Sequence, residues 1–256
     1  MLRLEYDGAR FAGSQLQTNA LTVQAVLEDA IEKATEERAR VAFAGRTDAG
    51  THARGQVGSF LSHSRLDIET MRRALNAWLP PDVAVRDVAE SLLDFDVRRD
   101  ALRRHYQYLI DNQAARSALE RERAWHVNVS LDVEAMAVAA RGVIGRHDFA
   151  AFAAPVETTG ASTVRDLQTF EVRRRRQAIT CDVVANAFLR HQVRRMVGAL
   201  VEVGKGALSP DDFTRLLDGP PASAGPTAPA HGLYLMRVDY ERELFSQTLD
   251  SEPALC

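Results

Sequence analysis

One carboxylate stands among several basic side chains in a glycine-rich stretch of the chain. Residues 44–56 read AGRTDAGTHARGQ, and their one acid, Asp48, is surrounded by Arg46, His52 and Arg54. Glycine allows backbone conformations and close approaches that a Cβ atom would block. An acid held among cations on such a loop is typical of a positioned catalytic carboxylate. The alternative is a surface turn with solvated charges.

A metal site is a second interpretation of this loop. Asp48 and His52 are four residues apart and His63 follows, a spacing that could serve a metal-dependent hydrolase. The loop is broken by glycines and no further ligand cluster follows, so we expect no metal. No Ser-His-Asp set and no reactive cysteine stands out either.

Short apolar runs on both sides of the loop predict the strands that hold it. In chain order the pattern of the first half predicts six elements: strand 1–6, helix 22–34 with Thr22 as its N-cap, strands 41–44 and 57–61, helix 68–78 and strand 83–88. The double proline at 80–81 ends the second helix. This order is the split βαβ arrangement of ferredoxin-like domains.

The second half repeats this order less regularly. Its pattern predicts strands 105–110 and 124–129, helix 133–143, a hairpin of strands 163–173 and 178–188, helices 190–203 and 211–217, and strand 233–240. We therefore expect an α+β fold of two ferredoxin-like halves that form a mixed, mainly antiparallel sheet. The halves are expected at 1–102 and 103–246, and the tail 247–256 is expected to be disordered.

Composition and length are ordinary for a globular protein. With 46% hydrophobic and 26% charged residues, the 256-residue chain can bury one large or two medium cores. Cys181 and Cys256 are too few for a disulfide framework, and Cys181 falls in an alternating strand pattern that makes it a core residue. No run of about eighteen apolar residues and no leader pattern is present, so the cytoplasm is the expected location.

Charge is unevenly distributed along the chain. The net charge is −3, which by itself argues against general nucleic-acid binding. Residues 163–205, however, contain nine basic and four acidic side chains, whereas 206–256 contain three basic and eight acidic ones. A basic face, with the run Arg173 to Arg176 as its densest part, is therefore compatible with an acidic protein. The alternative is that this run lines a solvated strand end.

The order of residues in the loop carries a resemblance to a known family. GRTDAGTHA resembles the signature loop of the tRNA pseudouridine synthase A (TruA) family. Further similar blocks follow the family's order: YDGARFAGSQLQ (6–17), TVQAVLEDA (22–30), RRHYQYLI (103–110), HDFAAF (147–152), ANAFLRHQVRRMVGALVEVGKG (185–206) and HGLYLMRVDY (231–240). The resemblance covers nearly the whole chain except its last dozen residues or so.

This resemblance implies an activity and a set of site residues. It implies an isomerase that converts uridine to pseudouridine at positions 38, 39 and 40 of the tRNA anticodon stem-loop, with Asp48 as the catalytic residue. The family pairs this acid with a basic residue matched by Arg194, stacks an aromatic residue matched by Tyr106 on the target base, and places an arginine matched by Arg46 near the flipped base. The isomerisation involves no redox change, so no cofactor and no metal is expected.

The resemblance also implies partners and one departure. It implies an RNA-binding cleft between the two halves, tRNA as substrate and a homodimer as assembly. Gln15 and Gln17 are expected RNA contacts, but Ser14 replaces the tryptophan that is usual in the family and removes one aromatic surface. The competing interpretation is a non-catalytic RNA-binding protein on the same fold, in which Asp48 has only a structural role.

Overall fold

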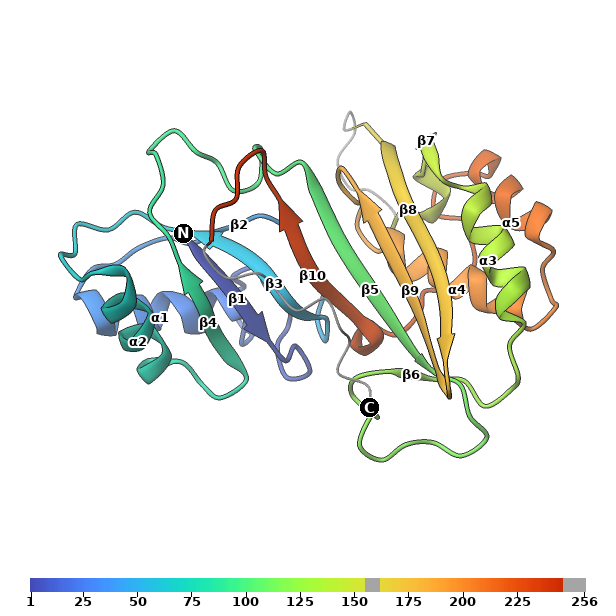
Figure 1. Cartoon of the computed structure of the whole chain (residues 1–256), viewed down its shortest axis with the longest axis horizontal. Helices are drawn as coiled ribbons and strands as arrows, with labels where there is room; N and C mark the ends of the chain where they lie inside the picture. Colours follow the sequence, from blue (N-terminus) through green and yellow to red (C-terminus); the bar gives the residue numbers. More distant parts are fainter. Residues whose placement is uncertain (155–161, 246–256) are drawn as a thin grey trace. The chain divides into compact units, whose positions relative to one another are not determined.

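The computed structural model describes residues 1–154 and 162–245, which form two compact units (Figure 1). The first unit contains Met1–Leu102 and, among the described residues, 234–245; the second contains Arg103–Leu233. The halves expected from the sequence, 1–102 and 103–246, stay a prediction. By its contacts the segment from Tyr234 groups with the first unit. The tail 247–256, predicted to be disordered, lies outside the described residues.

The first unit is a small sheet with two helices. Its elements in chain order are β1 (Leu2–Tyr6), α1 (Val23–Thr35), β2 (Ala42–Phe43), β3 (His52–Ser59), α2 (Ile68–Trp78) and β4 (Val83–Val88), joined by β10 (Leu233–Asp239). The predicted order of strand, helix, strand, strand, helix, strand is confirmed. Strand β1 lies between β4 and β3, β2 pairs with β3, and all three pairs are antiparallel. Strand β10 adds a parallel pair to β3.

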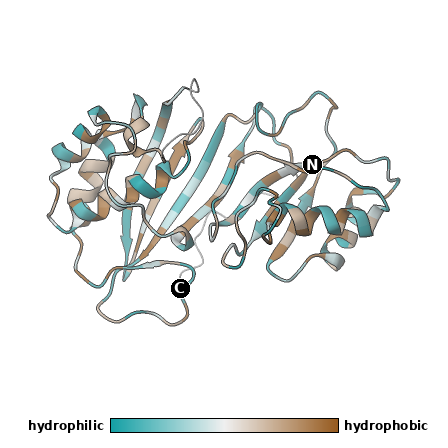
Figure 2. Ribbon diagram, turned by 180° about the vertical axis from the view of Figure 1, so that it is seen from behind, coloured by the Kyte–Doolittle hydropathy of each residue, from teal (hydrophilic) through white to brown (hydrophobic). Residues whose placement is uncertain are grey.

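Local signals fix the two helices of this unit. The Thr22 hydroxyl accepts a hydrogen bond from the amide of Ala25 at 3.2 Å, so it is the N-cap that the sequence predicts. The Asp67 carboxylate caps α2 in the same way. Each helix has one apolar side, and α1 and α2 pack against each other while α2 also contacts β4. In Figure 2 both helices carry hydrophobic and hydrophilic residues, as expected for helices with one buried side.

The second unit is a longer sheet with three helices. Its elements are β5 (Arg103–Asp111), β6 (Trp125–His126), α3 (Val133–Gly142), β7 (Gly145–Asp148), β8 (Val164–Arg175), β9 (Ala178–Ala185), α4 (Gln192–Gly204) and α5 (Pro210–Arg215), with 3-10 turns at Ala150–Phe152, Leu216–Asp218 and Ala230–Gly232. The strand order β5-β9-β8-β7 is antiparallel throughout, and β6 pairs with β5 in parallel. The described residues thus form an α+β fold with mixed, mainly antiparallel pairing, as predicted.

Two details of the second unit differ from the sequence-based expectation. Strand β7 was not predicted, because its residues GRHD show no apolar alternation; among the described residues it is an edge strand that pairs with β8. The predicted hairpin is confirmed as β8 and β9, but β8 extends to Arg175 and the chain turns at Arg176, whose φ is 54°. Cys181 on β9 is fully buried, as predicted, and its burial raises the pKa of the thiol. No helix in the described part of the chain is long and apolar enough to cross a membrane.

Helix α4 approaches the loop before β10 so closely that one of its positions requires glycine. A Cβ atom at Gly198 would lie 1.9 Å from the carbonyl oxygen of Pro226. We predict that Gly198→Ala lowers the free energy of unfolding by about 1–3 kcal/mol, because the backbone has to move to admit the methyl group. Urea denaturation measures this. Val138→Ala on α3 is the control: Val138 is 50% exposed, so its loss should change stability by less than about 0.5 kcal/mol. An unchanged midpoint for Gly198→Ala would contradict the close approach.

Candidate active site

The loop that carries Asp48 connects β2 to β3 in the first unit. It is shorter than the sequence suggested, because β3 begins at His52 and therefore includes His52 and Arg54. Asp48 is half-buried, Arg46 is exposed, and Thr47 between them is buried. The structure thus keeps the predicted Asp48 and Arg46 together on one loop, with the intervening threonine turned inward.

The segment Phe11–Ser14 is hydrogen-bonded to this loop. The amide of Ser14 donates to the carbonyl oxygen of Thr47 at 3.1 Å, and the amide of Thr47 donates to Ser14 Oγ at 2.9 Å. Beyond Asp48, the amide of Gly50 donates to the carbonyl oxygen of Phe11 at 3.2 Å. The loop backbone is therefore tied to the same segment on both sides of the carboxylate.

A buried hydroxyl pair holds the inward threonine. Tyr6 Oη at the end of β1 lies 2.8 Å from Thr47 Oγ1. Gln56 Nε2 on β3 donates to the carbonyl oxygen of Gly45 at 2.7 Å and, at 3.4 Å, to Tyr6 Oη. Burial raises the pKa of Tyr6 to about 12, with the hydrogen bonds from Thr47 and Gln56 opposing the rise. At neutral pH the Tyr6 phenol is therefore uncharged.

His52 is buried, and its contacts hold its ring in place. Its Nδ1 accepts a hydrogen bond from the amide of Gly8 at 3.0 Å, and its ring stacks on Tyr234 of β10 with centroids 4.7 Å apart. The Nδ1 atom also lies 3.2 Å from Asp7 Oδ1. Across the described residues, no group of three or more His, Cys, Asp or Glu side chains is placed to hold a metal ion. These contacts do not favour a hydrolase that uses Asp48 and His52 as ligands.

Tyr106 lies on β5 of the second unit. Its side chain is 8% exposed, and its ring meets that of Phe188 edge-on, with centroids 5.2 Å apart and an interplanar angle of 90°. Phe188 follows β9, which pairs with β5 along its full length. The Tyr106 ring is therefore held in one orientation by an aromatic neighbour and by a regular strand.

Arg194 lies in the first turn of α4, also in the second unit. Its Nε donates to the carbonyl oxygen of Ala228 at 2.7 Å, and the amide of Ala228 donates to the carbonyl oxygen of Arg194 at 3.0 Å. This reciprocal pair links the start of α4 to the loop before β10. Gly198, one turn further along α4, lies against the same loop. The base of the guanidinium group is thus fixed by the backbone.

The charge of Arg194 acts on two neighbouring side chains. Tyr108 donates its hydroxyl to the carbonyl oxygen of Pro229 at 2.7 Å; burial raises its pKa strongly, and Arg194 opposes the rise. Burial lowers the pKa of His231, which the positive charge of Arg194 lowers further. The Arg194 charge therefore reaches the region around Tyr108 and His231.

The four predicted site residues fall into two pairs. Asp48 and Arg46 belong to the first unit, and Tyr106 and Arg194 belong to the second. Sequence reasoning missed the residues that support the loop: Tyr6, Ser14, Thr47 and Gln56. All four lie inside stretches that the sequence analysis singled out, 6–17 and 44–56, but nothing in the sequence showed that Ser14 faces Thr47.

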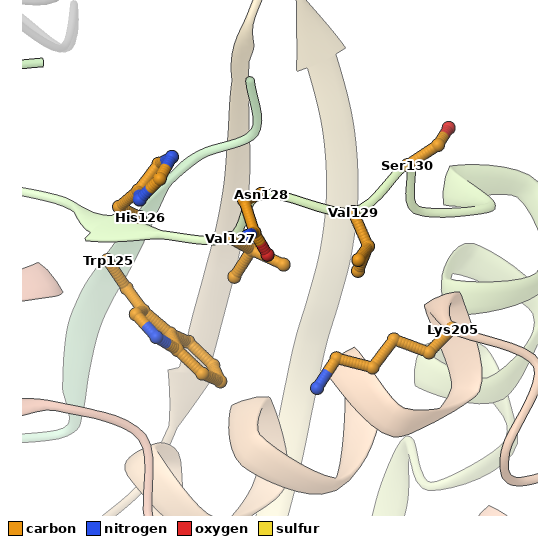
Figure 3. Close-up of a pocket in the computed structure, with 7 residues that line it drawn as sticks. All are labelled: Trp125, His126, Val127, Asn128, Val129, Ser130 and Lys205. Atoms are coloured by element: carbon orange, nitrogen blue, oxygen red, sulfur yellow. The ribbon is translucent and has the colours of Figure 1, made fainter. Parts of the chain in front are cut away.

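A separate pocket of about 460 Å³ lies in the second unit (Figure 3). Its lining residues are Trp125, His126, Val127, Asn128, Val129, Ser130 and Lys205. In Figure 3 the Lys205 side chain extends toward the side of the pocket where the Trp125 indole lies. None of the four predicted site residues lines it, so this pocket is not the predicted site.

Comparison with known proteins identifies the class. The family model described as tRNA pseudouridine synthase matches residues 4–100 and 139–241. The matched segments include Arg46, Asp48 and Arg194, and Tyr106 lies between them. The protein class is therefore that of the pseudouridine synthases.

Individual relatives narrow the class to one family. The tRNA pseudouridine synthase A of Roseiflexus sp. (strain RS-1) is 47% identical over 249 residues, covering 94% of this chain and 90% of the relative. The tRNA pseudouridine synthase A of Chloroflexus aurantiacus (strain ATCC 29366 / DSM 635 / J-10-fl) is 46% identical, covering 93% and 87%, and that of Geobacter sulfurreducens is 42% identical, covering 93% and 98%. The chain belongs to the tRNA pseudouridine synthase A family. The family and the isomerase class predicted from the sequence are confirmed.

The buried phenol beside the loop generates a pH-dependent prediction. Because burial raises the pKa of Tyr6 from its ordinary 10 to about 12, its contribution to stability is complete below pH 10 and is lost as the pH rises toward 12. Between pH 9 and pH 11, wild type should lose about 1.4 kcal/mol more of its free energy of unfolding than Tyr6→Phe does. Other groups that titrate in this range are present in both proteins, so they cancel in the difference.

Urea unfolding at the two pH values tests this prediction. The control is Tyr240→Phe, which removes a hydroxyl that donates to the carbonyl oxygen of Val97 at 2.7 Å in the same unit. Equal alkaline losses in wild type and Tyr6→Phe would show that Tyr6 is not held neutral by burial.

Proposed function

We propose that this protein converts uridine to pseudouridine at positions 38, 39 and 40 of the tRNA anticodon stem-loop, with Asp48 as its catalytic residue. The observation that carries the proposal is the placement of Asp48: it is half-buried on a loop whose backbone is hydrogen-bonded on both sides, in a chain of the tRNA pseudouridine synthase A family. A fixed but accessible carboxylate is what a reaction centred on one acid requires.

The reaction is an isomerisation in which bonds balance without a cofactor. The bond between ribose C1′ and uracil N1 breaks, a bond between C1′ and C5 forms, C5 loses its proton and N1 gains one. The Asp48 carboxylate could act by covalent attack on the nucleoside or by removal of the C2′ proton to give a glycal-type intermediate. Both routes use the ionised carboxylate, and both need the base turned out of its helix and held beside Asp48.

The remaining site residues take roles on the substrate. We propose that the units are ferredoxin-like halves and that Arg194 is the basic partner of Asp48. The reciprocal pair with Ala228 supports this role for Arg194, because it fixes the base of the side chain and so limits the positions that the guanidinium can take. The Tyr106 ring, held edge-on by Phe188, would stack on the flipped base, a contact worth about 1–3 kcal/mol. Arg46, exposed beside Asp48, would fill the gap in the stem or contact phosphate.

The proposed tRNA-binding surface includes the tip of the β8–β9 hairpin. Arg173 to Arg176 are all exposed, although part of their charge is already paired: Arg173 contacts Glu171 and lies 3.8 Å from Asp182, and Arg174 donates to Asn112 Oδ1. Arg175 and Arg176 at the tip are therefore the stronger candidates for phosphate contacts. We further propose a cytoplasmic homodimer whose two subunits share one tRNA.

Replacement of the carboxylate tests the central assignment. We predict that Asp48→Asn abolishes pseudouridine formation while leaving tRNA affinity within a few-fold, because affinity comes mainly from phosphate contacts. Pseudouridine mapping in tRNA after incubation with the pure variant gives the turnover. The matched control, Asp29→Asn on the exposed side of α1, should keep full turnover. Turnover by Asp48→Asn would contradict the catalytic assignment. Absence of turnover in the wild-type protein would favour a non-catalytic RNA-binding protein.

Salt dependence tests the basic surface. Each neutralised phosphate releases counterions with a slope of about −0.7 to −0.9 in a plot of log affinity against log salt. We predict that Arg175→Gln with Arg176→Asn flattens this slope by about one to two units. Asparagine is chosen at 176 because the φ of 54° there suits it better than a branched residue. The control pair Arg72→Gln with Arg73→Gln lies on α2, where both arginines pair with Glu69, and should leave the slope unchanged. An intact slope in the hairpin variant would place the RNA elsewhere.

Arg194 should respond differently from the hairpin. Because its proposed partner is Asp48 and not a phosphate, Arg194→Ala should reduce the single-turnover rate with little change in the salt slope. Both quantities are measured on the same preparation. A flattened slope with an unchanged rate would make Arg194 a phosphate contact and would leave the partner of Asp48 to another cation.

A further inference from the structure

Several hydrogen bonds hold Thr47, the residue directly before Asp48. We propose that Tyr6, Ser14 and Thr47 are positioning residues that fix the carboxylate of Asp48 for the chemical step through the shared Thr47–Asp48 peptide. This inference rests on the proposed function of Asp48. It concerns three side chains that need not touch the substrate.

Thr47 is held through three of its atoms. Its amide donates to Ser14 Oγ at 2.9 Å, its carbonyl oxygen accepts from the amide of Ser14 at 3.1 Å, and its Oγ1 lies 2.8 Å from Tyr6 Oη. All three residues are buried, and Ser14 is fully so. Because the carbonyl carbon of Thr47 is bonded to the nitrogen of Asp48, fixing Thr47 fixes where the Asp48 side chain starts.

The two segments come together because residue 13 is glycine. Gly13 has φ of 100°, and a Cβ atom there would lie 2.9 Å from the carbonyl oxygen of Thr47. This conformation brings the next residue, Ser14, alongside Thr47 with its amide and hydroxyl both facing the loop. In this chain the Oγ atom of Ser14 accepts from the amide of Thr47 and so takes the place of a backbone acceptor.

Gln56 orients the hydroxyl pair. Its Oε1 accepts from the amide of Val57 at 3.1 Å, so its Nε2 is the donor toward Gly45 and Tyr6. With its oxygen accepting from Gln56, the Tyr6 hydroxyl has its proton available for Thr47 Oγ1. The network thus reaches from β3 through β1 to the peptide before Asp48, and it connects the loop to two strands of the sheet.

Backbone hydrogen bonds also hold the loop on the far side of Asp48. The amide of Thr51 donates to the carbonyl oxygen of Asp48 at 3.1 Å, and that of Gly50 donates to Phe11. If the hydrogen bonds of Thr47 are lost, these two bonds still hold the loop, but the point where the Asp48 side chain starts is less well fixed. A displacement of about 1 Å at a reacting group can cost about 100-fold in rate, whereas tRNA affinity depends on phosphate contacts elsewhere.

A pair of substitutions at residue 47 tests the hydroxyl contact. Thr47→Val keeps the shape and removes the hydroxyl, and Thr47→Ser keeps the hydroxyl and removes the methyl group. We expect Thr47→Val to lower kcat about 10- to 100-fold with KM for tRNA within about two-fold, and Thr47→Ser to recover most of kcat. Tyr6→Phe removes the same hydrogen bond from the other side and should match Thr47→Val; it carries the test if Thr47→Val does not fold.

The double variant and a control separate positioning from stability. If one hydrogen bond carries the effect, Tyr6→Phe with Thr47→Val should lose no more kcat than either change alone. Tyr240→Phe, which loses a comparable hydrogen bond to Val97, should lower Tm without lowering kcat. Ser14→Ala should lower kcat as well, because it leaves the buried amide of Thr47 without its acceptor.

The outcomes distinguish this inference from the function on which it rests. If wild type forms pseudouridine but Thr47→Val and Tyr6→Phe keep its kcat, the positioning role is wrong and the function stands. If the variants raise KM by the same factor as they lower kcat, the network has a structural role only. The same conclusion follows if kcat falls only in proportion to the unfolded fraction. If wild type forms no pseudouridine in any tRNA, the proposed function fails first.

Discussion

The amide and carbonyl groups of the Asp48 loop need hydrogen-bond partners, although the loop itself is not part of a strand. Buried amides and carbonyl groups are costly unless they are paired, and residues 44–51 connect two strands without forming a ladder. The chain solves this with the segment Phe11–Ser14, which supplies a carbonyl, an amide and a hydroxyl to the loop. The position of the carboxylate therefore depends on a segment more than thirty residues earlier, and that segment depends on the positive φ of Gly13.

Arg194, in the second unit, is supported in a similar way. It lies in the first turn of α4 and exchanges hydrogen bonds with Ala228 in the loop that precedes β10: its Nε donates to the carbonyl oxygen of Ala228, and its own carbonyl oxygen accepts from the amide of Ala228. Gly198 lets that loop lie against the helix. In both units a side chain of the proposed site is placed by a glycine that admits a neighbouring backbone and by hydrogen bonds to that backbone. Such supports are rigid, and rigidity is what a reaction with one carboxylate needs.

Local patterns predicted the elements well, and non-local contacts explain what they missed. The Thr22 cap, the apolar sides of the helices and the β8–β9 hairpin all follow from residues near each other in sequence. Strand β7 was missed because an edge strand of polar residues has no apolar period, and the start of β3 was missed because His52 and Arg54 look like loop residues. Asp48 could be singled out by its motif. Ser14 could not, because its role depends on a contact with Thr47 that no local pattern encodes.

The departure at residue 14 also changes how the loop's surroundings are understood. From the sequence, Ser14 only removed an aromatic surface from the expected RNA contacts. In the structure it is fully buried and hydrogen-bonded to the residue before Asp48, while Gln15 and Gln17 beside it are exposed. One short segment can therefore act in two directions, with Ser14 toward the loop and the glutamines toward solvent. Gln15 is bonded directly to Ser14, so a contact made by Gln15 with RNA would lie one peptide bond from the residue that holds Thr47.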